Sequence, residues 1–112
     1  MALPRTQRLR RQKEILCVFR KSLRYETAEF LLRAHKKSGL PGRATVVVPK
    51  KVSKSAVIRN RLRRQAGEWF RTSVKVGELP IDCILTVKPG PVTTSRRNMR
   101  SALLILGQKF RS

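Results

Sequence analysis

A dense run of cations is the most distinctive chemical feature of this sequence. Residues 50–64 contain seven Lys and Arg side chains, and no acidic residue follows until Glu68: Lys50, Lys51, Lys54, Arg59, Arg61, Arg63 and Arg64. A solvated helix face usually mixes both signs, because like charges three or four residues apart cost about a few tenths of a kcal/mol each. A polyanion offsets this cost by releasing condensed counterions, and Arg adds forked hydrogen bonds to phosphate. The run therefore predicts nucleic-acid binding.

The other reactive residue types form no catalytic or metal-binding pattern. Asp82 is the only aspartate, His35 is the only histidine, and no G-x-S-x-G nucleophile motif occurs. Cys17 and Cys83 with one histidine cannot supply four zinc ligands unless carboxylates join them. We therefore expect no catalytic side chain, and no metal or cofactor bound by the protein alone.

Length and composition limit the remaining classes. The chain has 112 residues, with 27 Lys and Arg against 6 Asp and Glu, a net charge of +21, and we expect one domain over residues 1–112. The longest apolar run, residues 102–106, is far shorter than the roughly 20 residues that span a membrane. Cys17 and Cys83 are expected to be ordinary semi-buried thiols of a reducing compartment, so the cytoplasm is expected. The basic, acid-free residues 1–13 also resemble a mitochondrial presequence, but they fit the first helix of the fold.

The elements that must position these residues follow from hydrophobic periodicity. Helices are predicted over residues 6–21, 55–72 and 94–110, and strands over 30–35, 45–48 and 82–88. Thr6 is expected to cap the first helix. The Gly- and Pro-containing segment 36–43 predicts a turn between two antiparallel strands, and the later strand–helix–strand passage implies parallel pairing. This order predicts a two-layer α+β sandwich with one open sheet face.

Each predicted helix has an apolar face for the core. In the first helix this face contains Leu9, Ile15, Leu16 and Phe19. In the second it contains Ile58, Leu62, Ala66 and Trp69. In the third it contains Met99, Leu103, Leu106 and Phe110. Because the apolar face of the second helix is used by the core, its cations are expected to face outward.

Three motifs give the sequence a resemblance to a known family. Lys50-Lys51 is followed after seven residues by Arg59-Asn60-Arg61-Leu62-Arg63-Arg64, and then by Glu68-Trp69-Phe70-Arg71. This pattern resembles the signature of the bacterial ribonuclease P protein component. The resemblance extends over nearly the whole chain, because Val18-Phe19 resembles the end of the family's first helix and residues 84–89 resemble its last strand.

The resemblance implies a fold and a division of labour. It implies an α-β-β-β-α-β-α sandwich with a left-handed βαβ crossover, although the general rule favours right-handed crossovers. The protein would be the small partner of a catalytic RNA that hydrolyses the bond between precursor tRNA and its 5′ leader, with Mg²⁺ held by the RNA. Ribonuclease P RNA and precursor tRNA would be its partners, with no membrane and no obligate protein partner.

The resemblance also implies two binding surfaces. Contact with the catalytic RNA is expected from Lys50, Lys51, Lys54, Arg59, Asn60, Arg61, Arg63, Arg64 and Arg71. A cleft for the single-stranded leader is expected from Leu31, Arg33 and Val47, which share one sheet face by strand alternation, with Ile15 and Phe19 at its border. Plain core packing is the alternative for Ile15, Phe19 and Val47. A ribosomal or other structural RNA-binding protein is the alternative function.

Overall fold

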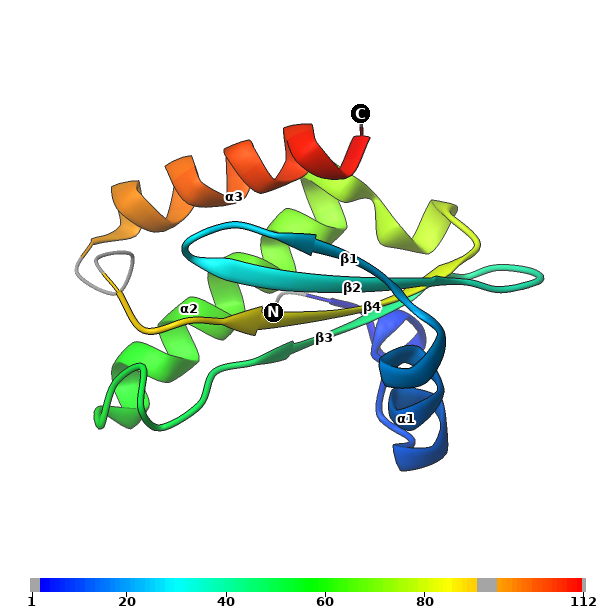
Figure 1. Ribbon diagram of the computed structural model, residues 1–112, viewed down its shortest axis with the longest axis horizontal. Helices are drawn as coiled ribbons and strands as arrows, with labels where there is room; N and C mark the ends of the chain where they lie inside the picture. The colour runs from blue at the N-terminus through cyan, green and yellow to red at the C-terminus, as the bar shows by residue number, and fades with distance from the viewer. Residues whose placement is uncertain (1–2, 91–94, 112) are drawn as a thin grey trace.

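The computed structural model describes residues 3–90 and 95–111, which form a four-stranded sheet with helices around it (Figure 1). The helices are α1 (Gln12–Lys21), α2 (Ala56–Trp69) and α3 (Arg96–Arg111), and the strands are β1 (Leu23–Glu26), β2 (Phe30–Lys36), β3 (Arg43–Val47) and β4 (Ile81–Val87). Short helical turns occur at Arg5–Gln7, Phe70–Val74 and Val76–Glu78. The order α-β-β-β-α-β-α confirms the expected α+β fold.

The strands lie in the order β1-β2-β4-β3, so β4 is inserted between β2 and β3. It pairs antiparallel with β2 and parallel with β3. The segment 36–43 therefore joins two strands that run antiparallel, as expected, but β4 lies between them. The reason is that β4 has apolar residues on both faces, with Ile84 and Leu85 both fully buried, so the centre of the sheet suits it best.

The connection from β3 through α2 to β4 is left-handed. In Figure 1, β3 and β4 point in the same direction, α2 passes behind them, and β4 lies on the β2 side of β3. Following the chain along this path gives a left-handed turn. The structure thus agrees with the family resemblance and departs from the usual right-handed rule.

The two faces of the sheet carry different layers. On one face, Phe30, Leu32 and Leu85 pack with side chains of α2 and α3 in the main core, including the fully buried Leu62 and Leu106. On the other face, a smaller cluster of Leu9, Val18 and Ile84 holds α1 at one end of the sheet. The rest of that second face is not covered by a helix layer (Figure 1).

The first helix begins at Gln12, and the expected start and cap at Thr6 are wrong. Thr6 lies in a short 3-10 turn, and the N–H of Leu9 donates to the carbonyl of Ala44 at 3.0 Å, at the edge of β3. Leu9 is only 2% exposed in this extended segment. Its burial against the sheet, together with this hydrogen bond, outweighs the local helical periodicity. Within α1 itself, Val18 is buried, whereas Leu16 is 45% exposed.

The other two helices follow the predicted faces and have serine caps. Ser55 accepts a hydrogen bond from the N–H of Ile58, so α2 begins at Ala56, and Ser95 does the same for Asn98 at the start of α3. The expected start of the last helix at residue 94 lies outside the described residues. The predicted core faces are confirmed: Leu62, Ala66, Met99 and Leu106 are fully buried, with Trp69 and Leu103 nearly so.

Candidate nucleic-acid interface

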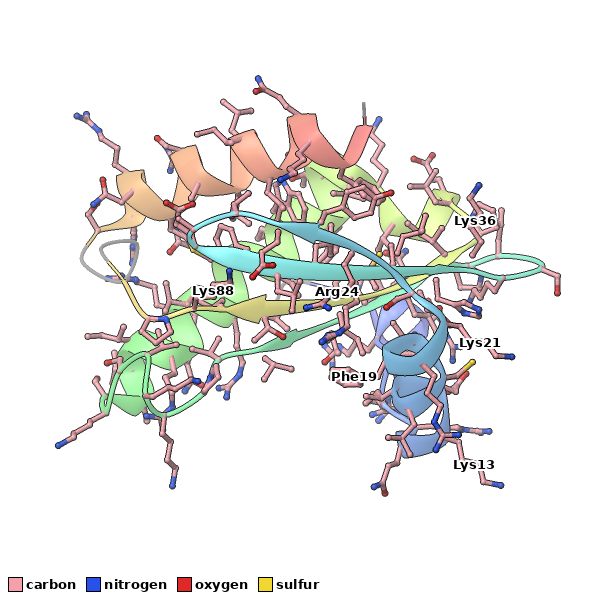
Figure 2. All side chains as sticks on the ribbon, in the orientation of Figure 1. Lys13, Phe19, Lys21, Arg24, Lys36 and Lys88 are labelled. Atoms are coloured by element: carbon pink, nitrogen blue, oxygen red, sulfur yellow. The ribbon has the colours of Figure 1, made fainter. Side chains whose placement is uncertain are left out.

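The open sheet face carries a mixture of cations and apolar side chains. The strand registers place Arg24, Arg33, Ile84 and Thr45 in one row across the sheet, and Glu26, Leu31, Thr86 and Val47 in the next. The predicted cleft residues Leu31, Arg33 and Val47 therefore do share one face. Figure 2 shows Arg24 over the middle of the strands and Phe19 projecting from α1 beside the sheet.

Arg33 and Phe19 make the closest link between this face and α1. The Arg33 guanidinium carbon lies 4.5 Å from the centre of the Phe19 ring, which is a cation–π contact. Within residues 3–90 and 95–111, the buried Nη1 of Arg33 has no hydrogen-bond partner. Phe19 is 46% exposed and Val47 is 40% exposed, so neither is plain core, whereas Ile15 packs partly against the small cluster under α1.

An ion-pair network fixes α1 to the sheet. Arg43 on β3 donates from Nε and Nη2 to the two Asp82 oxygens at 3.3 and 3.1 Å, and it also contacts Glu14 of α1. Lys37 reaches the same Asp82 carboxylate at 3.0 Å. The hydrogen bond to Glu14, followed by those to Asp82, raises the pKa of Arg43. Because Asp82 is buried, this network sets the position of α1 and therefore of the cleft border.

The predicted RNA-binding cations lie in the loop that follows β3 and on α2, the helix that packs on the other face of the sheet. Lys50, Lys51 and Lys54 are exposed in the loop that follows β3. At the start of α2, the Arg59 guanidinium donates to the carbonyl of Ser53 at 2.8 Å, which fixes the end of this loop. One turn further on, Arg63 donates to the Asn60 side-chain oxygen at 2.9 Å.

The α2 cations do not form one continuous face. Arg63 lies beside Arg8, Arg10 and the β3 edge, around a groove of about 410 Å³. Arg61 instead borders a groove of about 580 Å³ against α3, and Arg64 borders both grooves. Helical spacing in the sequence would already have placed Arg61 and Arg63 on different sides of α2.

Arg71 differs from the rest of the set. Its guanidinium makes two hydrogen bonds to the Glu68 carboxylate, the shorter of 2.6 Å, and these lower the pKa of Glu68 and raise the pKa of Arg71. The carboxylates of Glu14, Glu26 and Asp82 also form their ion pairs with cations outside the basic run 50–64. The cations of the run thus remain a concentrated positive surface, whereas the charge of Arg71 is partly offset.

Sequence reasoning missed three cations that the fold brings to these surfaces. Arg24 is directly opposite Arg33 in the β1–β2 register, and alternation in residues 23–26 would have shown it. Arg96 and Arg100 of α3 lie across the groove from Arg61. No local sequence pattern predicts that these cations lie near Arg61, because they are more than thirty positions away in the chain.

Neither a metal-binding cluster nor a membrane-spanning helix occurs among the described residues. Among residues 3–90 and 95–111, no group of three His, Cys, Asp or Glu could hold a metal ion. Within the same residues, no helix combines the length and apolar character needed to cross a bilayer.

The fold and these surfaces define a small basic α+β protein of the RNA-binding kind. Comparison with known proteins identifies its group: the Ribonuclease P family model matches residues 3–111. The ribonuclease P protein component of Synechococcus elongatus is 39% identical over 97 residues, covering 80% of this chain and 77% of that protein. The chain belongs to the ribonuclease P protein family and forms the protein subunit of ribonuclease P.

Solved structures agree on the fold. The RNase P protein of Staphylococcus aureus superposes with a TM-score of 0.71 at 19% identity, covering 94% of this chain and 89% of that one. The RNase P protein of Thermotoga maritima, solved with 1-(4-fluorophenyl)-2-thiourea, gives a TM-score of 0.69 at 22% identity and covers 92% of each chain. These structures confirm the expected fold, and the family model together with the Synechococcus elongatus relative confirms the expected family and general function.

Proposed function

We propose that this subunit uses its two layers for two different RNAs. The basic loop and α2, with Lys50, Lys51, Lys54, Arg59, Asn60, Arg61, Arg63 and Arg64, hold ribonuclease P RNA. The open sheet face and α1 bind the single-stranded 5′ leader of precursor tRNA. Arg71, which is already paired with Glu68, contributes less to RNA binding than its neighbours do.

The observation that carries the leader assignment is the contact between Arg33 and Phe19. It joins a guanidinium to a half-exposed aromatic ring on an open face. Single-stranded nucleic acids are bound by this combination, in which cations contact phosphates and apolar or aromatic side chains contact bases. Leu31 and Val47 extend the apolar part of the face along the strands.

In this proposal the cleavage chemistry belongs to the RNA. Mg²⁺ held by the RNA would activate water at the phosphodiester that joins the leader to the tRNA. The protein holds the leader in the cleft, and its cations lower the repulsion between RNA phosphates as the two RNAs approach.

Reconstitution tests the proposal directly. The purified protein alone should cleave nothing, whereas adding it to its RNA at low Mg²⁺ should restore removal of the 5′ leader. Metal-dependent cleavage by protein that has been freed of RNA would contradict the assignment of catalysis to the RNA.

A matched pair of variants tests the cleft. Phe19→Ala removes the ring under Arg33, and Leu23→Ala truncates a side chain that is 60% exposed at the start of β1. We expect Phe19→Ala to weaken binding of precursor tRNA by about tenfold, with little change for mature tRNA. Leu23→Ala should affect neither RNA. If Phe19→Ala weakened the binding of precursor and mature tRNA equally, the assignment of the leader to this face would be contradicted.

A further inference from the structure

A groove between α2 and α3 lies on the helical layer, away from the open sheet face. Its volume is about 580 Å³, within the range of about 300–1,000 Å³ in which small ligands bind. α2 contributes Arg61, Arg64, Gln65, Glu68 and Trp69, the helical turn Phe70–Val74 contributes Thr72, and α3 contributes Arg96, Arg100, Leu103 and Leu104.

The floor of the groove is apolar and held in place. Trp69 is 7% exposed, and its ring packs against Phe70 at a centroid distance of 4.9 Å. Gly107 of α3 comes so close that an added Cβ would lie 3.5 Å from the indole nitrogen. The Gln65 amide donates to the Arg96 carbonyl at 3.3 Å and ties the two helices together. A ligand would therefore meet a preformed surface, on which Leu104 remains 64% exposed.

The rim of the groove is strongly positive. Four guanidinium groups border it, two from each helix, against the single acid Glu68, whose carboxylate is already bonded to Arg71. Within the described ranges, Arg64, Arg96 and Arg100 form no ion pair. An apolar floor with a guanidinium rim is complementary to a flat apolar ring that carries phosphates on its sugar.

We propose that this groove binds one unstacked nucleotide of the RNA partner. The base would lie against Trp69 and Leu104, and the flanking phosphates would contact Arg100 and Arg64. A continuous duplex could not use the floor, since its bases remain stacked inside the helix. The inference rests on the proposed function for its RNA partner, but it assigns a site that includes α3 and recognises a bulge rather than a paired backbone.

Trp69 provides a direct readout, because it is the only tryptophan of the chain. The probe is a short RNA hairpin with one bulged nucleotide, compared with the same hairpin fully paired. We expect the bulged hairpin to bind about fivefold to tenfold more tightly by fluorescence anisotropy and to change Trp69 emission. The paired hairpin should bind through phosphates alone and leave the emission unchanged.

Two matched pairs of variants locate the effect. Arg100→Ala removes a rim cation, whereas Arg97→Ala removes an exposed cation of the same helix that does not border the groove. Leu104→Ser alters the floor, whereas Ile105→Ser alters a neighbour that is 58% exposed outside the groove. Only Arg100→Ala and Leu104→Ser should abolish the preference for the bulged hairpin. Each of the four variants should fold, because all four side chains are exposed.

Three results would overturn the inference. These are equal losses within each pair, Trp69 emission that stays constant at saturating bulged hairpin, and an acidic peptide such as polyglutamate that changes the emission as strongly as the hairpin. Reconstituted leader removal is measured in parallel with the same variants. Active wild-type enzyme without bulge preference rejects only the groove assignment, whereas failure to reconstitute rejects the proposed function itself.

Discussion

Replacing Arg43 with methionine should reveal how strongly the ion-pair network holds α1. Arg43 makes two hydrogen bonds to the buried Asp82 and one contact to Glu14, and methionine keeps most of the aliphatic stem. Removing one partner of a fully buried pair costs about 3–5 kcal/mol, and a surface pair contributes at most about 1 kcal/mol. The Arg43 side chain is 24% exposed, and Asp82 keeps Lys37 at 3.0 Å. We therefore expect a loss of about 2 kcal/mol.

Arg97→Met is the control, because it makes the same change of charge and side chain at an exposed position of α3. Urea unfolding followed by circular dichroism measures both free energies of unfolding, and the control should stay within about 0.5 kcal/mol of the parent protein. In thermal melts, Arg43→Met should lower the Tm by about 8 °C. Its affinity for precursor tRNA should fall as well, because α1 borders the cleft. Equal unfolding free energies for the two variants would refute this account of the network.

Three further predictions concern the core, the charges and the buried thiol. Leu62→Ala should cost about 2–5 kcal/mol by urea unfolding, because Leu62 is fully buried, whereas Val57→Ala at a 78% exposed site should cost almost nothing. Arg64→Ala should reduce the salt slope of RNA binding by about one unit and Arg71→Ala by clearly less, so equal slopes would contradict the role of its ion pair. Burial, with a smaller effect of the Asp82 charge, raises the pKa of Cys83 to about 12. The unfolded thiol ionises first, so between about pH 8.5 and 10.5 stability should fall by up to about 2 kcal/mol more than in Cys83→Ala. Parallel pH profiles of the two proteins would exclude this effect.

Local patterns determined much of this protein. The four-residue spacing of Ile58, Leu62 and Ala66 predicted the buried side of α2, and Met99, Leu103 and Leu106 did the same for α3. Alternation in residues 30–33 correctly placed Leu31 and Arg33 on the face opposite Phe30 and Leu32. The excess of cations and the motif around Arg59-Asn60-Arg61 indicated the family. Each of these signals depends on residues within a few turns or one strand.

Tertiary contacts decided the rest. Leu9 has helical spacing with α1, yet it lies extended because its N–H bonds to Ala44 and its side chain packs under the sheet. The place of β4 between β2 and β3, and the approach of Arg100 to Arg61, likewise join segments far apart in the chain. Periodicity reports which side of an element is apolar, but not which element will cover it. That choice is made by the packing of the whole core, and it also creates the groove between α2 and α3.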